Sequence, residues 1–197
     1  MSILALTSDT LAGTAASGQI EYNGQFYGTD SNAARGQFER LSLASVQNTT
    51  SGTAIDFTVP AWAKRITVIL RGVSTSNTNL STILLRLGSG TIQTTGYTSV
   101  CSFLQDATVV SVGASTGGFL VNVTADSAAL FTGTFVLTNY SGNLWVCAGQ
   151  FANTNSTQCS SSTGGVSLSG TLDTVRLTTT GGNNAFDAGA ANILIEG

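Results

Sequence analysis

The residues that could carry out chemistry are few and scattered. The 197-residue chain contains no histidine, the commonest general base, so a Ser–His catalytic arrangement is excluded. Glycoside hydrolysis would need two carboxylates that face each other across a cleft. The candidates for that role are Asp56, Asp106, Asp126, Asp173 and Asp187. Their spacing matches no catalytic motif, and aspartate recurs in turns, so we predict turn or capping roles for them and a protein that is not an enzyme.

The cysteines and glycines give no sign of a cofactor. Cys101, Cys147 and Cys159 lack the CxxC spacing of a zinc site, and their odd number indicates no closed disulfide framework. We predict buried or semi-buried free thiols, with a bridge between two of them left open. The glycine pairs precede no helix with a Lys-Ser/Thr pair, so no phosphate-binding loop is predicted. We therefore expect neither a metal nor an organic cofactor.

Two tyrosines are the candidates for contact with a ligand. Tyr97 and Tyr140 lie near predicted loops, and binding residues occur on loops more often than in cores. An aromatic face also suits stacking against a sugar ring. Trp145, in the run Leu-Trp-Val-Cys, is instead predicted to belong to the core.

The composition restricts the partners. Charged residues make up 9% of the chain, against about 25% in an average soluble domain, so Ser, Thr, Asn, Gln and Gly must build the polar surface. A formal charge of -3 and a pI near 4.6 oppose binding to nucleic acid. No apolar run approaches the roughly 20 residues that cross a bilayer. Residues 1–6 lack the basic start and the length of a signal peptide, so we expect synthesis in the cytoplasm without membrane insertion.

Residues 1–40 differ from the rest of the chain. Within residues 20–27, two aromatic-rich runs flank Asn23-Gly24, a pair that favours a type I′ turn, so a β-hairpin is predicted. An isolated hairpin is only marginally stable in water. We therefore predict an N-terminal attachment arm that docks on the following domain, on another copy of the chain or on a larger assembly. Its attachment residues are expected to be Ile20, Tyr22, Phe26, Tyr27 and Arg35.

Residues 41–197 have the pattern of a succession of short strands. Ile66, Val68 and Leu70 alternate with polar residues, as in a half-buried strand. About eleven strands are predicted, over residues 41–46, 54–58, 65–71, 83–87, 100–104, 109–112, 119–123, 134–138, 144–148, 172–178 and 192–195. Turns are predicted between them, among others at residues 72–74 and 160–165. This pattern predicts an all-β domain built as an antiparallel β-sandwich, in the form of a jelly roll, because two packed sheets limit exposed edges.

Three stretches taken together resemble virion proteins of tailed bacteriophages. Residues 18–27 resemble the "G-x-[IL]-E-Y-[DN]-G-x-x-[FY]" hairpin of phage fibre and virion surface proteins. Residues 56–68 resemble a strand-turn-strand segment of small phage β-domains, and residues 186–196 resemble their closing strand. The resemblance implies a homotrimeric β-sandwich with an N-terminal attachment segment, located on tail fibres or on the capsid exterior, and it brings no catalytic residues.

Three functions are compatible with these observations. The leading hypothesis is a non-enzymatic virion protein that acts as a tail-fibre or receptor-binding component at the particle surface. It would bind host-surface glycan weakly, and trimerisation would supply avidity. The first alternative is a capsid decoration (cement) protein that binds other virion proteins, since the chain lacks the long shaft of large tail fibres. The second alternative is a capsular polysaccharide depolymerase, which depends on the scattered aspartates alone.

Overall fold

The secondary structure is built almost entirely from β-strands. A computed structural model describes residues 17–22, 25–30, 34–76, 82–106, 108–123 and 127–197. Contacts divide the chain into two compact units, Met1–Arg40 and Leu41–Gly197. The described residues form seventeen β-strands and one short 3-10 turn, η1 (Thr180–Gly182), with no α-helix among them. Because every strand pair is antiparallel, the predicted all-β antiparallel class is confirmed.

The first unit contains a three-stranded sheet with the order β1 (Ile20–Tyr22), β2 (Phe26–Thr29) and β3 (Arg35–Gln37). Strands β1 and β2 form the expected hairpin, with Tyr22 opposite Phe26. This register leaves three residues between the paired positions, whereas the predicted two-residue turn would pair Tyr22 with Gln25. Three-residue hairpin connections are the next most common class. The predicted turn residues Asn23 and Gly24 lie outside the described residues.

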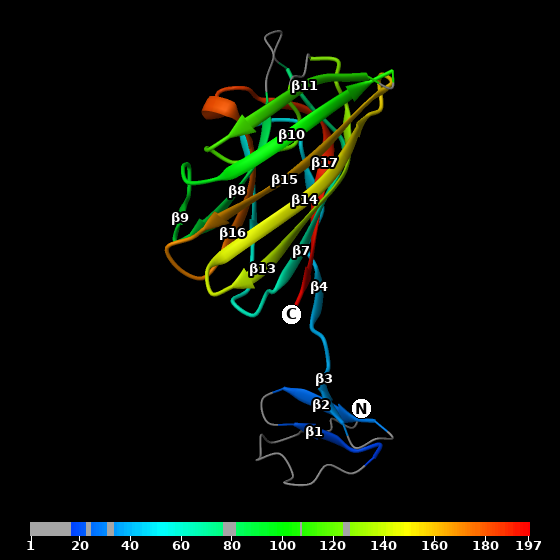
Figure 1. The fold of residues 1–197 in the computed structure, drawn as a ribbon, viewed down its shortest axis with the longest axis vertical. Coiled ribbons are helices and arrows are strands. Elements are labelled where there is room, and N and C mark those ends of the chain that lie inside the picture. Colours follow the sequence, from blue (N-terminus) through cyan, green and yellow to red (C-terminus); the bar gives the residue numbers. More distant parts are fainter. Residues whose placement is uncertain (1–16, 23–24, 31–33, 77–81, 107, 124–126) are drawn as a thin grey trace. The chain divides into compact units, whose positions relative to one another are not determined.

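The second unit is a β-sandwich of two sheets, which Figure 1 shows as layers packed face to face. The larger sheet has the order β11 (Thr108–Ser115), β10 (Thr98–Gln105), β15 (Gln158–Ser167), β14 (Leu144–Asn153), β13 (Phe131–Ser141), β7 (Arg65–Thr75), β17 (Phe186–Glu196) and β4 (Leu41–Leu43), and β5 (Gln47–Asn48) also pairs with β17. The smaller sheet has the order β12 (Phe119–Leu120), β8 (Ile83–Ser89), β16 (Thr174–Thr179) and β6 (Ala54–Thr58), and β9 (Thr91–Ile92) pairs with β8.

The core fills the space between these two sheets. Ile66, Val68 and Leu70 of β7 are buried, as their alternation predicted, and so is Trp145. From the smaller sheet, Leu85, Leu87, Val175 and Leu177 belong to the same buried cluster. A series of aromatic contacts links Tyr97 to Phe119, Phe119 to Phe135 and Phe135 to Phe151, with ring centroids 5.0, 6.4 and 5.1 Å apart. Such tilted and edge-on contacts stabilise a sandwich core beyond simple burial.

Strand β15 corrects the sequence prediction, which placed a turn at residues 160–165. The segment instead pairs along its length with β10 on one side and β14 on the other. Serine and glycine favour turns, and residues 160–165 contain three serines, two glycines and only one β-branched residue, Thr163, so the local sequence gives little sign of a strand. Tertiary contacts stabilise this segment as a strand. The buried hydroxyls of Ser160 and Ser162 donate to the backbone carbonyls of Val121 and Leu120.

The predicted turn at residues 72–74 is wrong for a related reason. These residues belong to β7, where Gly72 has φ +60° and the pairing with both neighbouring strands shifts register. Glycine adopts this conformation without steric cost. The chain therefore passes through a β-bulge and continues as a strand, which extends β7 beyond its predicted end.

Gly149 offers a test of how closely the sandwich is packed. A Cβ atom at this position would lie 2.5 Å from the ring atom Cδ1 of Phe135, which is fully buried. We expect Gly149→Ala to lower the free energy of unfolding by about 1–3 kcal/mol, because the core must shift to accept the methyl group. Gly165→Ala on β15 is the control, since its nearest neighbours lie at ordinary contact distances of 3.5 Å or more. Equal denaturation midpoints for both variants in urea would contradict this packing.

Candidate functional site

The small sheet of the first unit has one apolar face. Strand alternation and pairing place Ile20, Tyr22, Phe26 and Phe38 on this face, where the Tyr22 and Phe26 rings lie 4.9 Å apart. Ile20, Phe26 and Phe38 are 67%, 44% and 50% exposed. Three of the predicted attachment residues are thus brought together. Phe38 was missed, although continuing the alternation of β3 past its end would have found it.

The other two predicted attachment residues lie on the opposite, polar face of this sheet. The Arg35 Nε donates to the Glu21 Oε2 at 2.7 Å, and the Tyr27 hydroxyl bonds to the Gln25 side chain at 3.2 Å. The Arg35–Glu21 ion pair therefore links β3 to β1 within the first unit. A further role in attachment stays a prediction for both residues.

Tyr97, a predicted ligand contact, lies in the core of the sandwich. Its side chain is 1% exposed, and its hydroxyl accepts a hydrogen bond from the Leu87 backbone N–H at 2.7 Å. The hydroxyl also donates to the Gln93 carbonyl at 3.2 Å. Its position in the sequence predicted a loop, but the side chain points between the sheets just before β10. The ring is therefore almost fully buried, although Tyr97 also lines one of the hollows on the larger sheet.

Tyr140, the other predicted contact, is exposed. It lies near the end of β13, beside the turn into β14, and its side chain is 74% exposed. An exposed ring at this position is available for stacking. Contact with a ligand stays a prediction for this residue.

The burial of Tyr97 and Cys147 leads to a testable pH dependence. Desolvation raises the pKa of Tyr97 from 10.0 to about 12 and that of Cys147 from 9.0 to about 12. Both groups ionise at lower pH in the unfolded chain, so the stability they contribute is fully present below about pH 9 and is lost as the pH rises towards 12. We expect the free energy of unfolding, measured with urea, to fall across this range. The free energy of unfolding of Tyr97→Phe should fall less steeply as the pH rises. Its value at neutral pH should already be lower than that of the wild-type protein, because the variant loses the hydrogen bond from Leu87. If the free energy of unfolding falls equally steeply with pH in the wild-type protein and in Tyr97→Phe, ionisation of Tyr97 does not cause the loss of stability.

Asp56 joins two strands of the smaller sheet. Its carboxylate oxygens accept hydrogen bonds from the Arg176 Nε and Nη2, each at 2.6 Å. This bonding raises the pKa of Arg176. The bidentate pair links β6 to β16 at directly opposed positions, so Asp56 stabilises the sheet instead of the turn that was predicted.

Two other aspartates fix turns, as the sequence predicted. Asp173 accepts from the Gly90 backbone N–H at 2.5 Å, and Asp106 accepts from the Thr157 hydroxyl at 2.5 Å. Asp187 is exposed on β17, and Asp126 lies outside the described residues. The hollows of the larger sheet that are considered below are lined by none of the four described aspartates.

The three cysteines are free thiols, and no disulfide joins them. Cys101 and Cys147 are buried, as predicted, and burial raises the pKa of Cys101. Cys159 differs because it is exposed on β15. Within the described ranges, no group of three or more His, Cys, Asp or Glu side chains is placed to hold a metal ion. No helix in the same part of the chain is long and apolar enough to cross a membrane.

The outer face of the larger sheet is almost free of charge. Strand register aligns its outward side chains in rows, one of which comprises Ala114, Val100, Thr163, Ala148, Val136, Thr67, Leu194 and Leu43. The next row comprises Val112, Ser102, Ser161, Gln150, Thr134, Ile69 and Asn192. Neither row contains a charged residue. The charges that flank these rows are Arg65 and Glu196, which lie 3.5 Å apart on β7 and β17, and Arg71, which is exposed on β7 two residues beyond Ile69.

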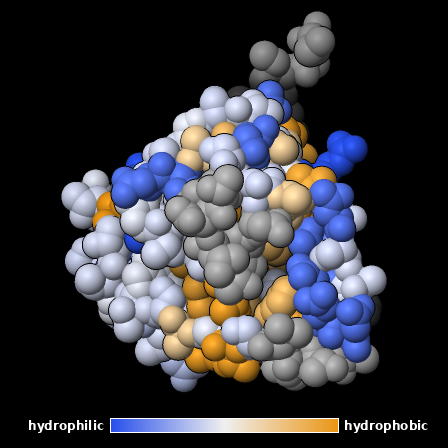
Figure 2. Space-filling model, turned by 90° about the horizontal axis from the view of Figure 1, so that it is seen from above, coloured by the Kyte–Doolittle hydropathy of each residue, from blue (hydrophilic) through white to orange (hydrophobic). Residues whose placement is uncertain are grey.

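Figure 2 shows one end of the sandwich from above. Pale, weakly polar residues cover much of this end, strongly hydrophilic residues form separate patches, and apolar residues lie towards the middle. A surface of hydroxyl and amide groups can donate and accept hydrogen bonds without the desolvation cost of a formal charge. The outer face of the larger sheet is therefore the candidate binding surface. Local sequence patterns do not reveal this surface, because its residues come from strands that are far apart in the chain, and binding residues were predicted in loops.

Comparison with known proteins identifies no relative. No protein-family model matches the sequence, and searches of curated proteins and of solved structures found no match. The functional assignment therefore depends on the fold and on the two surfaces described above.

Proposed function

We propose that this chain is a non-enzymatic virion protein of a tailed bacteriophage, located at the particle surface as a tail-fibre or receptor-binding component. Its sandwich binds a host-surface glycan on the outer face of the nine-stranded sheet. The observation that carries this proposal is the pair of uncharged residue rows on this face, in which hydroxyl and amide groups stand beside aliphatic side chains on the strands of a rigid scaffold. The described aspartates Asp56, Asp106 and Asp173 are engaged in holding strands and turns, which favours binding over catalysis.

The strand order supports a jelly roll as the scaffold. Without β9 and the two hairpins β10–β11 and β14–β15, eight strand positions remain, namely β4 with β5, β6, β7, β8, β12, β13, β16 and β17. When these positions are numbered in chain order, the first, eighth, third and sixth lie side by side in the larger sheet (β4, β17, β7 and β13). The second, seventh, fourth and fifth lie side by side in the smaller sheet (β6, β16, β8 and β12). Two Greek keys wound together give this order, which occurs in viral capsid and lectin domains. The two hairpins then extend the larger sheet beyond β13.

A neutral glycan is the partner that the face suits best. A polyanion such as nucleic acid requires clustered Lys and Arg, and neither row of the outer face provides them. Sugars present hydroxyl groups at the rim of each ring and C–H groups on its faces. The outer face offers both complements, since polar residues such as Gln150 and Thr134 alternate in register with aliphatic ones such as Val100 and Val136.

The apolar face of the first unit supports self-association, and the resemblance to phage virion proteins implies that the assembly is a homotrimer. Ile20, Phe26 and Phe38 gather three exposed large side chains on a sheet of only three strands. Burying such a patch between copies of the chain removes apolar surface from water. Association would also bring several weak glycan sites to one cell surface, so that avidity supplements the affinity of each site.

Binding to whole cells and to capsids tests the location and the role. We expect fluorescently labelled protein to bind, in a saturable way, cells of a strain on which the phage forms plaques. Saturable binding to undecorated capsids, with none to cells, would assign the capsid decoration role instead. Clearing of capsule around spots of purified protein would contradict the non-enzymatic assignment and favour a depolymerase.

The oligomeric state tests the role of the first unit. Light scattering at micromolar concentration should give the mass of a trimer, and Phe26→Asp should shift the population towards monomer because a charge would be buried at the interface. Gln37→Asp is the matched control, since it introduces the same charge on the exposed polar face of the same sheet. A monomeric wild-type protein, or equal masses for the two variants, would contradict the proposed interface.

A further inference from the structure

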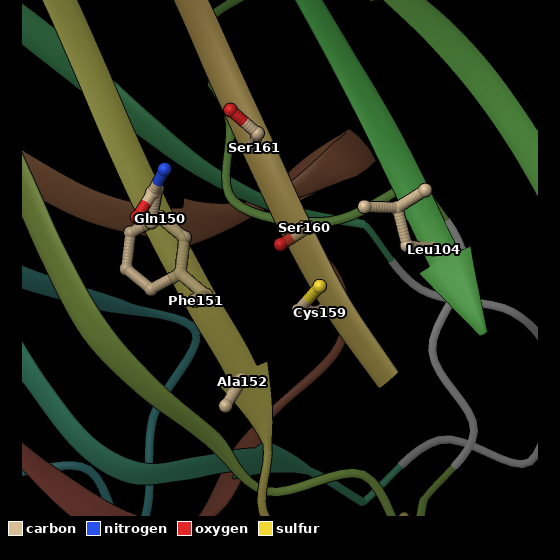
Figure 3. A pocket seen from close by; sticks show the side chains of 7 residues that line it. All are labelled: Leu104, Gln150, Phe151, Ala152, Cys159, Ser160 and Ser161. Atoms are coloured by element: carbon tan, nitrogen blue, oxygen red, sulfur yellow. The ribbon is translucent and has the colours of Figure 1, made fainter. Parts of the chain in front are cut away.

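Three hollows on the outer face of the larger sheet adjoin one another above β15. The first has a volume of about 350 Å³, and Figure 3 shows Leu104 of β10 and Gln150 of β14 on either side of Cys159 and Ser161 of β15. The second, of about 340 Å³, shares Gln150 and Ser161 with the first. The third, of about 590 Å³, shares Thr163 with the second. Because neighbouring hollows share lining residues of β15, the three adjoining hollows together are named the trough.

The trough exists because β15 carries small residues in the middle of the sheet. Its outward side chains are Cys159, Ser161, Thr163 and the hydrogen of Gly165. Larger side chains stand on the neighbouring strands, with Leu104 and Val100 on β10 and Gln150 on β14. The three hollows therefore meet along the line of β15, from which the second extends over β14 to Thr134 and the third over β10 to β11. From Cys159 to Gly164 this line is about 17 Å long at the usual rise of a strand.

The trough presents hydrogen-bonding groups that the fold leaves available. The side chains of Gln150, Ser161 and Thr134 are exposed and have no hydrogen-bond partner among the described residues. The amide of Gln150 offers two donors and an acceptor, and each hydroxyl can donate and accept. None of the residues that line the three hollows is charged.

We propose that this trough is the site at which the protein binds an extended, uncharged polysaccharide chain. The inference rests on the glycan binding proposed above and places it along β15. A length of about 17 Å accommodates several sugar units, and each hollow falls in the volume range of about 300–1,000 Å³ that is typical of ligand sites. Leu104, Val100 and Ala148 contact the C–H faces of the sugar rings, and Gln150 and Ser161 bond their hydroxyls.

Other extended ligands fit this surface less well. A peptide that binds to a sheet usually adds as a strand at an edge, where backbone groups are unpaired. Strand β15 is central, and its backbone already pairs with β10 and β14. An anionic polysaccharide would place its charges over hollows whose lining residues include no cation.

Substitution on the floor of the trough tests the site. Ser161→Gln fills the trough with an uncharged side chain at an exposed position, so the fold is retained. Thr138→Gln is the matched control, because it makes a similar change on the same outer face at an exposed residue of β13 outside the three hollows. We expect Ser161→Gln to weaken binding about tenfold or more, and Gln150→Ala to weaken it several-fold, while Thr138→Gln leaves it unchanged. The probes are an array of uncharged and anionic oligosaccharides and whole cells of the susceptible strain, and melting curves verify that each variant is folded.

The outcomes separate this inference from the function on which it rests. If wild-type protein binds cells or glycans and folded Ser161→Gln binds equally well, the trough is not the site, although the receptor-binding role stands. If wild-type protein binds preferentially to anionic oligosaccharides, the ligand class is wrong. If it binds neither cells nor any glycan, the proposed function itself fails.

Discussion

The alternation of side chains along the central strands of the nine-stranded sheet is the constraint on which the rest of the structure depends. Phe135 and Phe151 point inward and meet in the core, while their neighbours Thr134 and Gln150 point outward. A shift of one residue in the pairing would exchange the two sets and expose the aromatic rings. The inner set thus fixes the register, and the register in turn determines which polar groups share the outer face.

The same alternation orients two polar side chains of β15 into the core. Ser160 and Ser162 of β15 point inward, where a side chain would ordinarily be apolar, and each donates to a carbonyl of the segment around β12. A buried carbonyl without a partner would cost about 1–3 kcal/mol, so these bonds offset a penalty and connect the two sheets at this corner. Small inward serines also leave room for β12 to lie close to β15. The composition of β15 is therefore constrained on both of its faces.

Sequence patterns predicted the elements whose own residues carry a local signal of a strand or a hairpin. The alternation in β7 and the aromatic residues around the β1–β2 hairpin are local signals, and both elements form. Strand β15 and the bulge at Gly72 could not be predicted, because a run of Ser, Thr and Gly becomes a strand only when β10 and β14 pair with it. Tyr97 was misplaced because sequence position near a loop does not reveal side-chain direction. The candidate surface was missed because it combines residues of strands that are far apart in the chain.

Low charge on such a surface has an energetic consequence for binding. A charged group must lose its hydration when a ligand covers it, and the loss is recovered only where an opposite charge is placed accurately. Hydroxyl and amide groups exchange bonds with water for bonds with the ligand at little net gain or cost, so each contact along the outer face contributes little. Binding is then weak for a single short ligand and increases with the number of contacts along an extended one. Because the groups stand on paired strands, little additional conformational entropy is lost on binding, which favours a surface built on strands over one built on loops.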